Sequence, residues 1–372
     1  MGDIVNEYSD PMQTPHDGYV RLGIRSHGKG TFYNYVKPGQ ELGTAQMHKV
    51  ATDKLIVNIT FAWEHAVAIT DENDAEKLVS HRFPQFSLSE KICPKFLHYL
   101  ILDGRFRHHL WLSSPGGAGR NRVLKIPEML EYKMQIPSVD EQRQIAYTLC
   151  RLDNLITLHQ RKYDNLVNVK KAMLEKMFPK DGADVPEIRF KGFTEAWEQC
   201  KLGNLASFSK GYGYSKSDLM ESGTPIILYG RLYTNYETVI SDVDTYANEK
   251  KGSVYSRGGE VIVPASGETA EDISVASVVE KQGVLLGGDL NIIKPIRILN
   301  SGFLAISISN DNPHKEMAKM AQGKSVVHLH NADLEKINLN FPSCDEQVLI
   351  STYFQNIDNL ITLHQRKLLN LV

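Results

Sequence analysis

The sequence predicts an α+β protein, with two α/β domains separated by a pair of long antiparallel coiled-coil-like helices in a pseudo-two-fold internal repeat. Three observations predict it. The string DNLITLHQRK occupies residues 153–162 and recurs, letter for letter, at residues 358–367. Around each copy, apolar residues recur in alternating steps of four and three, the period of a coiled-coil seam. The segments before the two copies differ in sequence and carry β-branched and aromatic runs broken by Gly, Pro or Asp.

The repeat divides the chain into five segments. An identical decamer in a chain of 372 residues is not a chance match, so we take its surroundings as a guide to the domain borders. Gly2 aligns with Gly203, which marks the restart of the fold in the second half. We expect a first domain at 1–136, a central helix at 137–179, a linker into the next domain at 180–200, a second domain at 201–341 and a distal helix at 342–372.

The two variable domains are expected to be rich in strands. DKLIVNITFAWEHAVAIT (53–70) and GGEVIVPASGETAEDISVASVVE (258–280) have the composition of strands separated by turns. PKFLHYLILDGRFRHHLWLS (94–113) and SGFLAISIS (301–309) fit either short helices or buried strands, and the sequence leaves both possibilities open. Each domain is therefore interpreted as α+β.

Each helix has a sequence signal for its start. Pro-Ser-x-Asp-Glu-Gln occurs at 137–142 and at 342–347, and the proline discourages any helix that runs in from upstream. The pairs Ser138–Glu141 and Ser343–Glu346 make the S-x-x-E pattern of a capping box. No Gly or Pro interrupts residues 140–178, so the first helix could extend for about 57 Å.

The predicted seam uses equivalent positions in both helices. The alternative is two ordinary amphipathic helices, each on its own domain, but the length of the seam and the identical decamers favour a pair. One shared position is a histidine, which fits either a polar residue that sets the register or a metal or proton site. The absence of Cys, Asp or a second His at ligand spacing favours the first interpretation. The seam residues are Ile145, Leu149, Leu152, Ile156, His159 and Tyr163, with Ile350, Phe354, Ile357, Ile361, His364 and Leu368.

Composition and motifs exclude several classes of function. With 42% apolar and 23% charged residues and a net charge of −2, the chain resembles an ordinary globular protein rather than a basic nucleic-acid binder. No secretory leader or membrane span is expected, and four scattered cysteines fit a reducing cytoplasm. There is no phosphate-binding loop, nucleophile elbow or zinc spacing, so we expect neither a catalytic centre nor a metal site.

The sequence resembles the specificity (S) subunits of type I restriction–modification enzymes over essentially its whole length. The resemblance rests on the two Pro-Ser-x-Asp-Glu-Gln starts, the two decamers, AMLEKMFPK at 172–180 and IRFKGFTEAWEQCKLG at 188–203. The segment PEIRFKGFTEAWEQC has no counterpart before Met1, and the second helix lacks the continuation NVKKAMLEKMFP of the first. Relative to the family pattern, both ends therefore look trimmed.

The resemblance implies a non-catalytic subunit that binds double-stranded DNA. Each variable domain would be a target-recognition domain that reads one half of a split, non-palindromic target. The helices would set the spacer between the halves and bind two methyltransferase (M) subunits that methylate adenine. Restriction–translocase (R) subunits would join the complex. We expect no cofactor on this chain, since S-adenosylmethionine and ATP would bind the partner subunits, and no contact with a membrane.

Candidate DNA contacts come from basic loops that contain glycine. No acidic residue lies between Gly104 and Pro127, and glycine lets backbone amides approach a phosphate. Each loop could instead be solvated with incidental charge, and Trp63 fits a core position better than a base contact. The DNA-binding candidates are Arg21, Arg25, Lys29, Gly117, Gly119, Arg120, Arg122, Lys210, Arg231, Ser266, Gly323 and Lys324.

Two classes of function follow from these observations. The first is the DNA-reading subunit, and the alternative is a structural coiled-coil scaffold whose two domains bind ligands other than DNA. If the two domains face one duplex, their helices should run antiparallel, and His159 and His364 should meet near the centre of the pair. Salt-dependent duplex binding separates the two classes, since phosphate contacts release counterions.

Overall fold

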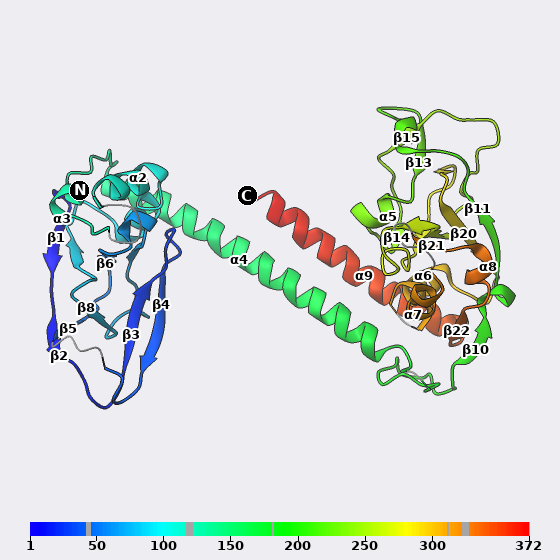
Figure 1. Cartoon of the computed structure of the whole chain (residues 1–372), viewed down its shortest axis with the longest axis horizontal. Helices are drawn as coiled ribbons and strands as arrows, with labels where there is room; N and C mark the ends of the chain where they lie inside the picture. Colours follow the sequence, from blue (N-terminus) through cyan, green and yellow to red (C-terminus); the bar gives the residue numbers. More distant parts are fainter. Residues whose placement is uncertain (42–45, 117–121, 181, 311, 322–326, 372) are drawn as a thin grey trace. The chain divides into compact units, whose positions relative to one another are not determined.

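The computed structural model of the chain describes residues 1–41, 46–116, 122–180, 182–310, 312–321 and 327–371 (Figure 1). It divides into two compact units, Met1–Leu155 and Ile156–Val372. Each unit combines β-sheets with helices, so the mixed α/β class expected from the sequence is confirmed.

The described residues of the first unit form two sheets. The first is antiparallel, with strand order β1-β9-β6-β7, formed by Val5–Tyr8, Gln85–Leu88, Lys54–Val57 and Val67–Ile69. In the second sheet, of order β2-β5-β8-β3-β4, β3 and β8 run parallel while the other pairs are antiparallel. Its strands are Pro11–Gln13, Gln46–Lys49, Leu78–Ser80, Tyr19–Ile24 and Thr31–Val36.

Short helices cover one face of the first sheet. The run 94–113, which the sequence left open, folds as helices α1 (Pro94–Leu100) and α2 (Gly104–Leu112). Successive residues of β6 point to opposite faces, so Leu55 and Val57 pack with these helices while Ile56 packs toward the second sheet. The remaining elements of this unit are η1 (Ala62–Glu64), α3 (Ile126–Leu130) and the start of α4 (Val139–Lys176).

The second unit repeats the first sheet with one strand added. Its order is β11-β20-β16-β18-β14, and the first four strands correspond in order to β1-β9-β6-β7. These strands are Ala206–Lys210, Leu290–Pro295, Glu260–Pro264, Ser277–Val279 and Val239–Ile240. The other sheets are β12-β15-β13-β19 and the pairs β10-β22 and β17-β21. Their strands are Leu219–Met220, Tyr246–Ala247, Thr224–Ile227, Leu285–Leu286, Glu198–Lys201, Asn338–Phe341, Ser266–Gly267 and Val327–His328.

The helices of the second unit also follow the pattern of the first. The open run 301–309 is helical, within α6 (Ser301–Asn310), and is almost wholly buried. Val261 and Val263 of β16 pack with α6, whereas Ile262 packs on the opposite face of the sheet. The other helices are η2 (Leu202–Asn204), η3 (Lys216–Asp218), α5 (Arg231–Thr234), α7 (Asn312–Met320), α8 (Asn331–Leu334) and α9 (Cys344–Leu369).

A buried glutamine ties each long helix to its own domain in the same way. The Gln142 amide donates to the carbonyls of Lys91 and Pro137, and its oxygen accepts from the amide of Cys93 at 2.8 Å. Gln347, 205 residues later, donates to Ile298 and Pro342 and accepts from the amide of Asn300 at 2.8 Å. Both glutamines are 0% exposed, so the internal repeat extends to individual hydrogen bonds.

Within the second unit, α9 lies beside the C-terminal half of α4 and runs antiparallel to it (Figure 1). Nδ1 of His159 lies 2.9 Å from Nδ1 of His364. Eleven residues further along α4, Lys170 Nζ lies 2.5 Å from a carboxylate oxygen of Asp358. The partner number on α9 falls as the number on α4 rises, which is the antiparallel order expected from the repeat.

The predicted seam residues have different roles. Ile350, Phe354 and Ile357 are buried in the core of the second unit, and Ile361 packs against that core. Ile145 packs against the core of the first unit, whereas Leu152 is 37% exposed. The apolar period therefore has two causes. Over part of each helix the apolar residues pack against a domain, and over another part they pack against the other helix. The remaining seam residues are Leu149, Ile156, Tyr163 and Leu368, each partly buried.

Only one of the two predicted capping boxes has its serine contact. The amide of Glu141 donates to the hydroxyl of Ser138 at 3.4 Å, but Ser343 makes no side-chain cap. Glu346 is 1% exposed and forms a two-bond pair with Arg189, at 2.7 and 2.8 Å. The capping box expected at Ser343 and Glu346 is therefore wrong, because the arginine holds the carboxylate through stronger charge-assisted hydrogen bonds.

Candidate nucleic-acid interface

In the first unit, a tight turn carries two of the predicted DNA contacts. The amides of His27 and Gly28 donate to the carbonyls of Glu64 and His65, so the turn after β3 is held against η1. Gly28 has φ +65°, and a Cβ there would come within 2.6 Å of Leu102, so this position favours glycine. The turn thereby presents Arg25 and Lys29 on the surface, next to η1.

These two cations have different surroundings. The Arg25 guanidinium donates to the carbonyl of Thr31 and lies 5.3 Å from the ring centroid of Phe32. Lys29 is exposed and, in the part of the chain that the structure describes, has no acidic partner. Lys29 is therefore available to an anion, whereas Arg25 is already oriented by Phe32 and the carbonyl.

A second cationic surface lies on the exposed face of α2. Trp63, Arg107, His108 and Trp111 line an open cleft of about 460 Å³. His108 stacks on Trp111 with ring centroids 6.0 Å apart, and the Arg122 guanidinium lies 4.7 Å from the Trp111 ring. Aromatic faces beside cations suit the bases and phosphates of a nucleic acid. Trp63 is partly exposed in this cleft, so the sequence-based preference for a core position is wrong.

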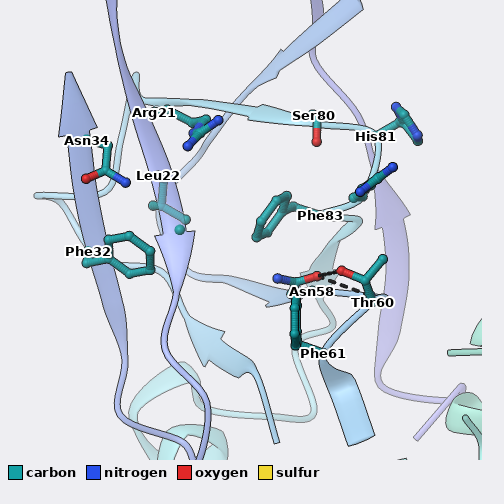
Figure 2. Close-up of a pocket in the computed structure, with 12 residues that line it drawn as sticks. Arg21, Leu22, Phe32, Asn34, Asn58, Thr60, Phe61, Ser80, His81 and Phe83 are labelled. Atoms are coloured by element: carbon teal, nitrogen blue, oxygen red, sulfur yellow. Dashed lines mark hydrogen bonds between the residues drawn. The ribbon is translucent and has the colours of Figure 1, made fainter. Parts of the chain in front are cut away.

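A third feature is a pocket of about 420 Å³ at the β3–β4 hairpin (Figure 2). Arg21 and Asn34 line it from the hairpin, and His81 and Arg82 line it from the connection between β8 and β9. Sequence reasoning identified Arg21 but missed His81 and Arg82. The basic and aromatic triplet His81-Arg82-Phe83, placed directly after the strand Leu78–Ser80, was the signal that could have found them.

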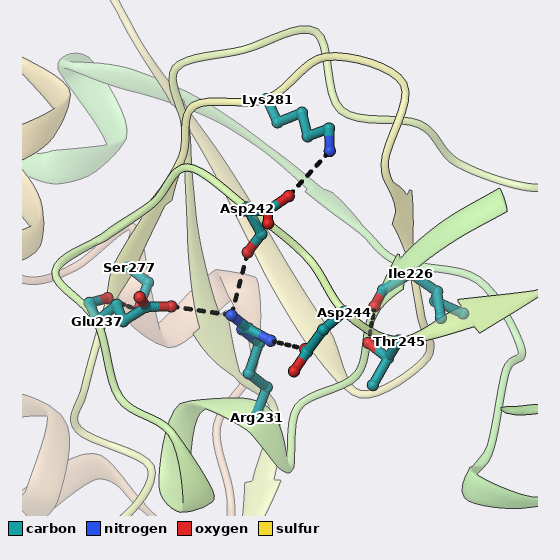
Figure 3. Close-up of polar contacts among 8 residues, drawn as sticks. All are labelled: Ile226, Arg231, Glu237, Asp242, Asp244, Thr245, Ser277 and Lys281. Atoms are coloured by element: carbon teal, nitrogen blue, oxygen red, sulfur yellow. Dashed lines mark hydrogen bonds and ion pairs between the residues drawn. The ribbon is translucent and has the colours of Figure 1, made fainter. Parts of the chain in front are cut away.

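The candidate Arg231 of the second unit is held in an ion-pair network (Figure 3). Its guanidinium lies 2.9 Å from Glu237 and 2.7 Å from Asp244, and it donates to the carbonyl of Asp242. The side chain is 12% exposed. Lys281 pairs with the Asp242 carboxylate at 3.1 Å, so the acidic groups here are also partnered. Arg231 thus stabilises its own loop, and a phosphate would have to compete with two carboxylates for it.

The other second-unit candidates differ in exposure. Lys210 is exposed at the end of β11. Ser266 is 6% exposed, and its carbonyl accepts a hydrogen bond from the Tyr233 hydroxyl at 2.7 Å. Its side chain is therefore poorly placed to reach DNA. Five candidates lie outside the described residues: Gly117, Gly119, Arg120, Gly323 and Lys324.

Among the described residues, no group of three or more His, Cys, Asp or Glu side chains could hold a metal ion. Burial lowers the pKa of His364, and His159, Lys162 and Lys367 lower it further by charge repulsion. At 2.9 Å, one histidine must donate and the other accept, so at most one of the two facing nitrogens carries a proton. Within the same described ranges, no helix is long and apolar enough to cross a bilayer.

Comparison with known proteins identifies the family. The sequence model described as the type I restriction modification DNA specificity domain matches residues 26–168 and 194–372, which together form most of the chain. The chain is 23% identical over 334 residues to the type I restriction enzyme MjaVIII specificity subunit of Methanocaldococcus jannaschii, covering 86% of this chain and 77% of that protein.

The chain also has similarity to solved structures. An S subunit from M. genitalium is 12% identical, with 100% of this chain and 91% of that chain covered and a TM-score of 0.49. The HsdS subunit of Thermoanaerobacter tengcongensis is 17% identical, with 98% and 90% covered and a TM-score of 0.46. The family match over both halves identifies the protein class: the chain belongs to the type I restriction–modification DNA specificity family, whose members are the non-catalytic DNA-recognition subunits of these systems.

Proposed function

We propose that the two domains read the two halves of a split, non-palindromic DNA target. The observation that carries this proposal is that the two units share the strand order of one sheet but differ in the charged side chains on their surfaces. In the first unit, Arg21, Lys29, Arg82 and Arg107 have no acidic partner among the described residues, whereas Arg231 of the second unit is bound by two carboxylates. Palindromic reading needs identical readers about a two-fold axis, and these readers differ.

The helix pair would set the spacer between the half-sites. In an antiparallel pair, residues at equivalent positions of a repeat meet only near a two-fold axis. His159 and His364 are equivalent and lie in contact within the second unit, which supports a pseudo-two-fold relation between the helices. The 38 residues of α4 correspond to about 57 Å of helix, long enough to serve as a ruler.

The identical decamers would serve a second purpose, the binding of two methyltransferase subunits. Leu155 and Leu158 of α4 are 40% and 46% exposed, and their equivalents Leu360 and Leu363 of α9 are 43% and 44% exposed. Exposed leucines at matching positions form two equivalent apolar surfaces. Two copies of one partner would need such a pair of surfaces. Contact with M subunits would therefore explain why the two decamers are identical even at positions that lie outside the seam.

The chemistry would then belong to the partners. M subunits would hold S-adenosylmethionine and methylate adenine, and R subunits that join the complex would use ATP. Mapping methylated adenines in DNA exposed to this chain with its M subunits tests the proposal. Two different half-sites, separated by unread bases, are expected. One contiguous motif or two identical inverted half-sites would contradict it.

Salt dependence separates this function from the scaffold alternative. If the domains bind DNA through phosphates, the logarithm of the binding constant should fall linearly with the logarithm of the salt concentration, by about 0.9 per phosphate contact. A domain that binds a protein or a glycan would show no such slope with duplex DNA. Fluorescence anisotropy of a labelled duplex between about 50 and 200 mM salt provides the measurement.

A further inference from the structure

Hydrogen-bond donors line the pocket beside the β3–β4 hairpin, and none of its described lining residues is acidic. Two arginines line it from different elements, Arg21 from β3 and Arg82 from the β8–β9 connection. His81, from the same connection, also lines it, and Figure 2 shows Arg21 and His81. In the part of the chain that the structure describes, neither arginine has a carboxylate partner or a hydrogen bond from its side chain. Both guanidinium groups are therefore free to bind a ligand.

Asn58 adds a neutral donor to the pocket. It is 8% exposed, and its side-chain oxygen accepts from both the amide and the hydroxyl of Thr60, at 3.1 and 2.8 Å. Because a backbone amide can only donate, the atom that faces Thr60 must be the oxygen. Asn58 lines the pocket, and its NH₂ group lies on the side away from Thr60, as Figure 2 shows.

Aromatic rings complete the walls. Phe32 from the hairpin, Phe61 and Phe83 line the pocket, and Phe61 is 40% exposed. A Cβ at Gly23 would collide with the ring of Phe32, so glycine at this position allows the ring to lie across β3. A volume of about 420 Å³ falls within the range of small-ligand sites. A pocket of this volume, with a neutral amide and aromatic rings in its walls, suits a nucleic-acid base better than it suits a phosphate group alone.

We propose that this pocket is a base-reading site of the first recognition domain, and that the base it reads is guanine. Guanine presents two adjacent acceptors, N7 and O6, in the major groove, which match the two parallel donors of an arginine side chain. Adenine and cytosine each present an amino donor there, and thymine presents one acceptor. A pocket of unpaired arginines and an amide NH₂, with no carboxylate among its described residues, selects the base whose edge presents two acceptors and no donor.

This inference rests on the proposed function, since it assigns a base to one half of the split target. The test uses the full chain assembled with its M subunits, after the target has been mapped by adenine methylation. Each guanine of the target is replaced in turn by 7-deazaguanine, which lacks the N7 acceptor. At one position in one half-site, we expect the dissociation constant of the wild-type complex to rise by about fivefold or more.

Lysine substitutions separate base reading from phosphate binding. Lysine keeps the positive charge but loses the two-pronged donor geometry, and it still binds phosphate as a point charge. In the variant with Arg21→Lys and Arg82→Lys, affinity for the natural target should fall by about 5- to 150-fold, the range for one arginine–guanine pair. The salt slope should remain unchanged, and 7-deazaguanine should then have no further effect. Thermal unfolding of the variant checks that it is folded.

Lys29→Ala is the matched control, because Lys29 is an exposed cation outside the pocket. This substitution should weaken the binding of all duplexes to the same extent and reduce the salt slope by about one unit. The inference is overturned if neither half-site contains guanine, if 7-deazaguanine affects the lysine variant as much as the wild type, or if the lysine variant keeps its guanine preference. In each of these cases a split target would still stand, whereas loss of the split target itself would overturn both proposals.

Discussion

Lengthening both helices at their centre should move the two half-sites apart. We consider four helix-forming residues inserted after His159 in α4 and four after His364 in α9. Each residue adds about 1.5 Å of rise, so the pair grows by about 6 Å on its length of about 57 Å. At about 3.4 Å per base pair along the duplex, this corresponds to roughly two extra base pairs of spacer. Four residues also keep the alternating steps of four and three nearly in phase.

The assay is methylation mapping with the same M subunits. The two methylated adenines should lie about two base pairs further apart than in the wild type, while the bases of both half-sites stay the same. Four residues inserted next to Gly182, in the linker between α4 and β10, provide the control and should leave the spacer unchanged. An unchanged spacer in the helix variant, or altered half-site bases, would refute the proposal that the length of the helix pair sets the spacer.

Three further predictions concern binding and stability. Replacing Gln347 with Leu removes its hydrogen bonds to two carbonyls and one amide, which leaves these buried backbone groups unpaired. The free energy of unfolding of the second unit, measured by urea titration, should therefore fall by about 3 kcal/mol or more. The change Val348→Ala, at the exposed neighbouring residue, should have little effect. Arg107→Ala combined with Arg122→Ala should reduce the salt slope of duplex binding by up to about two units, and an unchanged slope would exclude both from phosphate contact. The pKa of His364 is lowered in the folded chain, so its contribution to stability is present above the unfolded pKa of about 6.5 and is lost as the pH falls. Thermal unfolding should therefore show a smaller loss of stability between pH 7.5 and 5.5 in His364→Asn than in the wild type, and equal losses would argue against this role.

Local sequence patterns were sufficient to predict the helices and strands that depend on neighbouring residues. The 3.5-residue period and the absence of Gly and Pro indicated both long helices, because these features act within a few turns of one helix. The β-branched and aromatic runs in 53–70 and 258–280 indicated strands, and the buried strands β6 and β16 lie within them. The internal repeat also anticipated a shared domain fold, visible in the common strand order.

Periodicity could not say what each apolar residue packs against. Ile350 and Phe354 fit the seam pattern, yet they are buried in the core of the second unit. A helix that lies on a domain and also on another helix uses adjacent faces for the two contacts, and a period of 3.5 residues describes both. The S-x-x-E pattern failed at Glu346 for a related reason, since its actual partner, Arg189, lies 157 residues away in the sequence.

By itself, the sequence determined the repeat, the two long helices, the mixed α/β domains and the family resemblance, because identity and periodicity are properties of neighbouring residues. Only the tertiary structure decided which cations are available to DNA. Arg231 looked available in the sequence but is bound by Glu237 and Asp244, whereas Arg21 and Arg82, 61 positions apart in the chain, line one pocket. The availability of a charge depends on partners that folding brings within a few ångströms, and no spacing rule along the chain specifies them.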